Sequence, residues 1–206
     1  MKIQKTKNLY GLVLIGGKST RMKKDKGLLS FHDRPQAVYA YELLDQFCEK
    51  TFVSCRKEQG REKLLAGLAQ IHDNPGYEGK GPLAGILSAM EIHPKATWLV
   101  LACDLPFVQA ATLDELLRNR RTEKIATAFR SAHDGLPEPL CAVYEAHGLA
   151  VLQDFFQNDM HCPRKIMMNS EVALIDPTDP AALDNINRPD EYEKARAALN
   201  ERKLHG

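Results

Sequence analysis

The chain has 206 residues, of which 44% are hydrophobic, and its 28 basic and 27 acidic residues leave a formal net charge of +1. This is the size of one α/β domain with a full hydrophobic core, so we expect residues 1–206 to form a single domain. The balanced charge argues against a nucleic-acid partner or an acidic membrane surface, so any anion site has to be local.

The sequence contains no recognisable membrane span or export signal. No uninterrupted apolar run approaches the roughly 18 residues of a membrane helix, and the lysine-containing start, MKIQKTKNLY, holds no long apolar stretch. We therefore expect a cytoplasmic protein without a membrane partner. The five cysteines are an odd number and form no CxxC pair, which favours free thiols over a disulfide framework or a zinc site.

Short apolar runs rich in β-forming residues alternate along the chain with helical patterns. The strand candidates are residues 10–15, 51–55, 97–103, 124–129 and 140–144. The helix candidates are residues 37–47, 81–92 and 111–119, followed by a last helix that begins at Pro189. This βαβ alternation predicts an α/β fold in which helices cover both faces of a mainly parallel sheet, in three layers.

Two of these strand candidates, residues 10–15 and 97–103, are almost continuously apolar. Strands that are covered on both faces have this composition, so we expect both near the centre of the sheet. Ligands of open α/β sheets bind beyond the carboxyl ends of the strands. The segments that follow Ile15 and Ala102 are therefore expected to face one crevice.

The segment after Ile15 reads GGKSTRMKKDKG and combines paired glycines with clustered cations. It is no Walker A loop, because the required first glycine falls on Leu12, and no GxGxxG fingerprint, because Gly16 and Gly17 are adjacent. Backbone N–H groups of the glycines, with Arg21 and Lys26, suit a phosphate chain. A solvated basic loop is the alternative on charge alone.

Asp104 directly follows the apolar run 97–103 and precedes Leu105 and Pro106. A carboxylate at the end of a central strand is placed to hold Mg²⁺ on the phosphates of a nucleotide. A turn-forming or helix-capping aspartate is the other interpretation of this position.

Four segments, in order along nearly the whole chain, resemble one family. They are LIGGKSTRMKKDK (residues 14–26), GPLAGILSAM (81–90), LACDLPFV (101–108) and NINRPDEY (185–192). Together they are similar to the signature of the nucleotidyltransferases of sugar phosphates and cofactors, and most similar to the molybdenum cofactor guanylyltransferases. The resemblance implies a Rossmann-like nucleotidyltransferase domain.

The resemblance also implies a set of site residues. Asp104 would hold Mg²⁺ and, with Lys26 and Arg21, would form the catalytic group. Asp73 would accept from the N1–H and N2–H₂ groups of guanine, although in Asp-Asn-Pro-Gly it equally suits a turn. The implied nucleotide-binding residues are Leu14, Ile15, Gly16, Gly17, Lys26, Asp73 and Asp104. The candidates for the acceptor lie in the last third of the chain and are Arg164, Lys165, Asn185, Asn187 and Arg188.

The implied reaction is the Mg²⁺-dependent transfer of GMP from GTP to molybdopterin, giving the molybdopterin guanine dinucleotide and pyrophosphate. The acceptor phosphate is already anionic near neutral pH, with a second pKa of about 6, so the reaction needs cations rather than a histidine base. Proteins that deliver molybdopterin and molybdoenzymes that receive the cofactor are the implied partners.

Two positions depart from the family pattern, which usually has glycine at Lys23 and asparagine where this chain reads Cys55-Arg56. They keep three alternatives open. The chain could be a cytidylyltransferase for the same cofactor, a nucleotidyltransferase for a sugar phosphate, or a nucleotide-binding relative with weak catalysis.

Overall fold

The computed structural model of the protein describes residues 5–15, 31–32, 34–57, 59–186 and 189–205. In these residues seven strands form one sheet in the order β3-β2-β1-β4-β6-β5-β7. The strands are β1 Thr6–Leu14, β2 Cys48–Cys55, β3 Gln70–His72, β4 Thr97–Ala102, β5 Ala126–Arg130, β6 Pro137–Tyr144 and β7 Val172–Ile175. Only β6 runs against its neighbours β4 and β5; the other described pairs are parallel.

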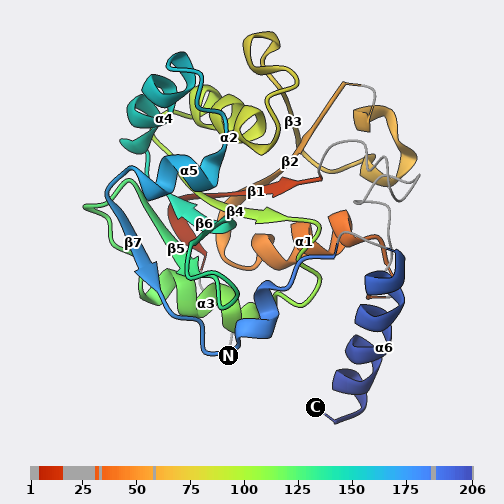
Figure 1. Cartoon of the computed structure of the whole chain (residues 1–206). Helices are drawn as coiled ribbons and strands as arrows, with labels where there is room; N and C mark the ends of the chain where they lie inside the picture. Colours follow the sequence, from red (N-terminus) through yellow and green to blue (C-terminus); the bar gives the residue numbers. More distant parts are fainter. Residues whose placement is uncertain (1–4, 16–30, 33, 58, 187–188, 206) are drawn as a thin grey trace.

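Helices lie on both faces of this sheet (Figure 1). They are α1 Gln36–Asp45, α2 Pro82–Ile92, α3 Ala110–Arg118, α4 Gly148–Gln157, α5 Pro163–Met168 and α6 Pro189–His205. Short 3₁₀ turns occupy Gln59–Arg61, Lys63–Leu65, Pro75–Tyr77 and Pro180–Leu183. The α/β class and the mainly parallel sheet predicted from the sequence are confirmed.

Side chains along the central strands point alternately to the two faces of the sheet and pack in a separate hydrophobic core on each face. In β1, Val13 packs in the core formed with α1 and α3, whereas Leu12 and Leu14 pack in the core formed with α2, α4 and α5. All six residues of β4 are buried, as expected for a strand covered on both sides. The three layers are thus confirmed, with β4 at the middle of the sheet.

The five predicted strands are all present, but β1 and β2 begin four and three residues earlier than the sequence indicated, and β6 begins three residues earlier. Pro137 and Pro139 lie within it, and proline normally argues against a strand because it lacks a donor N–H. The pairing of β5 with β6 is irregular between Ala128 and Phe129, beside these prolines. A sheet tolerates proline at irregular positions of this kind, because the regular hydrogen bonding between the strands is already interrupted there.

Four elements were not predicted: β3, β7, α4 and α5. The strand β3 has three residues with one buried apolar side chain, Ile71, which is too short for a recognisable alternation. The helix α4 does carry a helical spacing, since Leu149, Leu152 and Phe156 pack in the same core. That signal was available in the sequence.

The predicted free thiols are also confirmed. Cys48, Cys55, Cys103 and Cys141 are buried and Cys162 is exposed, and all five are free. Among the described residues, no helix is both long enough and apolar enough to cross a membrane.

Candidate functional site

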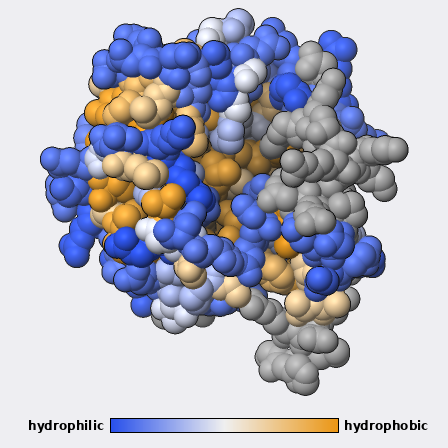
Figure 2. Space-filling model, in the orientation of Figure 1, coloured by the Kyte–Doolittle hydropathy of each residue, from blue (hydrophilic) through white to orange (hydrophobic). Residues whose placement is uncertain are grey.

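The carboxyl ends of β1 and β4 lie side by side. Leu14 is the register partner of Ala102, and the backbone N–H of Cys103 donates to the carbonyl of Leu14 at 3.0 Å. In this region the surface is hollowed, and apolar residues are visible inside the hollow (Figure 2). The crevice expected beyond Ile15 and Ala102 is therefore supported by the strand order and by the shape of this face.

Six of the predicted site residues lie outside the described part of the chain. They are Gly16, Gly17, Arg21, Lys26, Asn187 and Arg188. Lys23, one of the two departures from the family pattern, lies outside it as well. The roles assigned to these residues stay predictions.

Asp104 lies in the turn that follows β4. Its carbonyl accepts a hydrogen bond from the N–H of Ile186 at 2.8 Å. This contact brings Asn185, predicted to bind the acceptor, next to the predicted metal ligand. The structure therefore joins two parts of the site that are about 80 residues apart in the sequence.

Asp73 follows β3 at the same edge of the sheet. Burial raises the pKa of its carboxyl, while the nearby Arg56 and a hydrogen bond from Ser54 act in the opposite direction. Cys55 is the register partner of His72, so Arg56 directly follows β2 where Asp73 follows β3. The pair consists of one acceptor and one donor group, the combination that suits a base edge carrying both donors and acceptors.

The start of α2 packs tightly against this corner. A Cβ built on Gly85 would lie 2.3 Å from Ser54 Oγ, so only glycine allows this approach. Asn74, beside Asp73, is anchored to α2 because its N–H donates to Ser88 Oγ at 2.8 Å. Gly81 precedes the helix with φ 66°, in the left-handed region that glycine adopts freely.

The departure at Cys55 is accommodated inside the protein. Its Sγ lies 3.7 Å from Gln70 Oε1 and 3.6 Å from His72 Nδ1. Burial, followed by the charge of Asp73, raises the pKa of this thiol to about 11. Cys55 is therefore a neutral packing residue near neutral pH. Of the two residues Cys55 and Arg56, it is Arg56 whose charge acts on Asp73.

The edge spans the length of a nucleotide. Asp73 and Asp104 follow β3 and β4, and β2 and β1 lie between these strands. Three strand spacings separate them by about 14 Å in the plane of the sheet. A nucleoside triphosphate can extend between two such points, with its base at one and its phosphates at the other.

Sequence reasoning missed a third carboxylate at this edge, that of Glu138 at the start of β6. Glu138 is only 6% exposed. One carboxylate oxygen accepts from the N–H of Leu140 at 3.1 Å, and the other accepts from Arg164 Nη2 at 3.0 Å. The signal was a lone charged residue within the apolar run LPEPLCAVY, which two prolines obscured.

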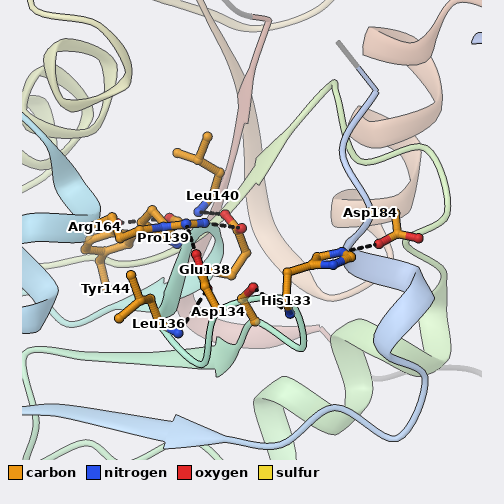
Figure 3. Close-up of polar contacts among 10 residues, drawn as sticks. His133, Asp134, Leu136, Glu138, Pro139, Leu140, Tyr144, Arg164 and Asp184 are labelled. Atoms are coloured by element: carbon orange, nitrogen blue, oxygen red, sulfur yellow. Dashed lines mark hydrogen bonds and ion pairs between the residues drawn. The ribbon is translucent and has the colours of Figure 1, made fainter. Parts of the chain in front are cut away.

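Arg164, on α5, also reaches the turn between β5 and β6, as Figure 3 shows. Its Nη1 donates to Asp134 Oδ2 at 3.0 Å. On the far side of the same turn, His133 Nε2 lies 2.8 Å from Asp184 Oδ1. The turn thereby links α5 with the segment that contacts Asp104.

The residues at this edge fit a magnesium ion without forming a complete cage. Among the described residues no group of three His, Cys, Asp or Glu side chains could hold a metal. Magnesium usually takes one or two carboxylates and completes its shell with phosphate oxygens and water. Asp104 at the end of a central strand suits that kind of site.

The fold defines a class: an open, mainly parallel α/β sheet of the kind that binds its ligands beyond the carboxyl ends of the central strands. Comparison with known families makes this specific. Residues 11–171 match the MobA-like NTP transferase domain. The chain therefore belongs to the MobA-like NTP transferase family, a family of nucleotidyltransferases.

Similar proteins and structures agree with this assignment. A "Molybdenum cofactor biosynthesis bifunctional protein" of Synechocystis sp. is 38% identical over 89% of this chain, which spans only 52% of that protein. A "Molybdenum cofactor guanylyltransferase" of Pseudomonas fluorescens is 29% identical over 86% of this chain and 88% of its own. The crystal structure of "Molybdopterin-guanine dinucleotide biosynthesis protein A" from Archaeoglobus fulgidus has the same fold, with a TM-score of 0.77 and 23% identity over 93% of this chain and 99% of its own.

Proposed function

We propose that this protein transfers GMP from GTP to molybdopterin, with Mg²⁺, and releases pyrophosphate. Family membership and the names of the similar proteins support the transfer and the guanine nucleotide. The single observation that carries the proposal is the edge itself. Asp73 and Asp104 flank the buried end of β1, and the segment with Asn185 is hydrogen-bonded to Asp104.

The chemistry requires few proton transfers. An oxygen of the acceptor phosphate attacks the α-phosphorus of GTP, the bond from that phosphorus to the bridging oxygen breaks, and pyrophosphate leaves with the electron pair. Mg²⁺, when bound, would neutralise charge on the phosphates. The protein has to hold two anions in line and to counter their repulsion.

The described residues divide this work between two ends. At the base end, Asp73 is oriented by the hydroxyl of Ser54 and would accept from guanine N1–H and N2–H₂. Adenine does not offer those donors, so this carboxylate would favour GTP. At the phosphate end, Asp104 would hold the ion, and Asn185, which precedes the residue hydrogen-bonded to Asp104, would contact the acceptor.

Pyrophosphate release tests the proposal. The protein is incubated with Mg²⁺, molybdopterin and each of GTP, CTP, ATP and UTP, and the same is done for Asp104→Ala. We expect release with GTP alone, and a loss of about 10²- to 10³-fold in Asp104→Ala. Asp114→Ala, an aspartate on the exposed side of α3, is the matched control and should retain full activity.

Other outcomes separate the alternatives. Release with CTP would indicate a cytidylyltransferase. Release only when sugar phosphates replace molybdopterin would identify a different acceptor. Tight binding of GTP without turnover, with every acceptor, would contradict the transferase proposal and indicate a nucleotide-binding protein.

A further inference from the structure

Glu138 is an unusual residue for its position because it is a carboxylate buried at an edge that already carries Asp104. In the antiparallel pairing of β4 with β6, Leu101 is the partner of Cys141. The end of β4 that leads to Asp104 and the start of β6 that carries Glu138 therefore lie at the same edge of the sheet. The charge of Asp104 accordingly adds to burial in raising the pKa of the Glu138 carboxyl.

Two hydrogen bonds nevertheless hold the carboxyl group of Glu138 in a fixed orientation. The N–H of Leu140 and the guanidinium of Arg164 each donate to one of its two oxygens, at 3.1 and 3.0 Å. Arg164 is itself tethered by Asp134, whose other oxygen accepts from the N–H of Leu136 at 3.1 Å. Hydrogen bonds to a charged carboxylate favour that charge and restrict its rotation.

Two neighbouring carboxylates repel each other, and burial makes the repulsion stronger. A divalent cation between or beside them converts this repulsion into attraction for the ion. Such carboxylates need not bind the metal directly: magnesium keeps several of its waters, and an outer carboxylate can accept hydrogen bonds from them.

We propose that Glu138, oriented by Arg164, is a positioning residue for the divalent cation held at Asp104. The inference rests on the proposed function, since it concerns the metal of that same site. It adds a second carboxylate, from the antiparallel strand β6, to a site that the sequence suggested only on the parallel strand β4. Glu138 acts through its charge and its hold on the waters of the ion.

The test measures metal binding rather than turnover. Mn²⁺ replaces Mg²⁺, and its free concentration is followed by electron paramagnetic resonance during titration of the protein with GTP present. In Glu138→Gln, Kd for Mn²⁺ should rise about 10- to 100-fold. The affinity for GTP in EDTA should change less than about threefold, because the lost charge acts on the cation.

Three further variants serve as controls for the Mn²⁺ titration. Glu171→Gln makes the same chemical change at an exposed residue paired with Lys124 and should leave Kd for Mn²⁺ unchanged. Glu138→Asp keeps the charge on a shorter side chain and should fall between wild type and Glu138→Gln. Asp104→Ala should abolish the tight Mn²⁺ site.

An unchanged Kd in Glu138→Gln, together with a loss in Asp104→Ala, would overturn the inference and leave the proposed function intact. If Glu138→Gln does not fold, Glu138→Asp decides: an unchanged Kd in this variant overturns the inference equally. Failure of the wild-type protein to bind GTP would refute the proposed function instead, and the two failures are therefore distinguishable.

Discussion

Replacing Gly85 by alanine should weaken both the fold and the base end of the site. The new Cβ would meet Ser54 Oγ at 2.3 Å and Leu14 Cδ2 at 3.1 Å. Ser54 cannot simply rotate away without cost, because its hydroxyl donates to Asp73. The substitution is thus expected to displace the group that orients a predicted guanine ligand.

The magnitude follows from three contributions. Overpacking in a core costs about 1–3 kcal/mol, and the weakened hydrogen bond to Asp73 adds about 1 kcal/mol. Alanine in place of glycine within a helix returns about 1 kcal/mol. The free energy of unfolding should therefore fall by about 1–3 kcal/mol, which lowers Tm by roughly 2–4 °C for each kcal/mol in a protein of this size.

A double-mutant cycle in urea, with GTP binding measured in parallel, separates the two effects. Ser54→Ala/Gly85→Ala removes the Oγ clash but leaves a Cβ contact of 3.2 Å, so part of the stability should return. GTP affinity should not return with it, because Asp73 still lacks its donor. A single variant as stable as wild type, or a double variant whose losses merely add, would refute this reasoning.

Three other predictions concern the rest of the chain. Arg120→Met should lower the free energy of unfolding in urea by about 3–5 kcal/mol. The change leaves the buried Glu145 carboxylate, which is 5% exposed, without its bidentate partner. Arg118→Met, a control in an exposed ion pair, should lower it by less than about 1 kcal/mol. Iodoacetamide at pH 7.5 should modify one thiol in the folded protein, that of Cys162, since the other four are buried, and peptide mapping checks this; rapid labelling of a second thiol would contradict the packing described. Hydrogen bonds from Leu136 and Ser131 lower the pKa of Asp134 below its unfolded value of 3.8. The ionised carboxylate therefore stabilises the fold above that pH, and this stabilisation is lost as the pH falls through the lower pKa of the folded state. Below about pH 4, the urea midpoint of Asp134→Asn should accordingly vary less with pH than that of wild type.

The sequence predicted the parts of the fold whose pattern is locally strong. The buried strands β1 and β4 are read directly from continuous apolar runs, and α2 from its spacing and from Pro82 at its first turn. The weak elements failed for a physical reason: β3 and β7 are short, and what stabilises them is pairing with distant strands.

The site divides in the same way. Asp104 could be singled out from the sequence because it follows the continuous apolar run of β4. Asp73 came only from the family resemblance, because β3, which precedes it, is too short to recognise. Glu138 was not singled out, because it lies near the start of an antiparallel strand, and its position at the same edge as Asp104 depends on the pairing of β6 with β4, which no local pattern specifies. The hydrogen bond from Ile186 to Asp104 is equally beyond local reasoning, since it joins residues from separate segments.

The last helix is attached through a core of its own. Phe31, Ile186, Ala195 and Leu199 form a cluster separate from the two cores of the sheet, with Tyr192 packed beside it. A cluster this small gives α6 a lower opening free energy than global unfolding, so its amides should exchange first among those of the helices. Ile186 belongs both to this cluster and to the hydrogen bond at Asp104. A ligand bound at the edge of β4 should therefore slow amide exchange in α6, at a distance from the ligand.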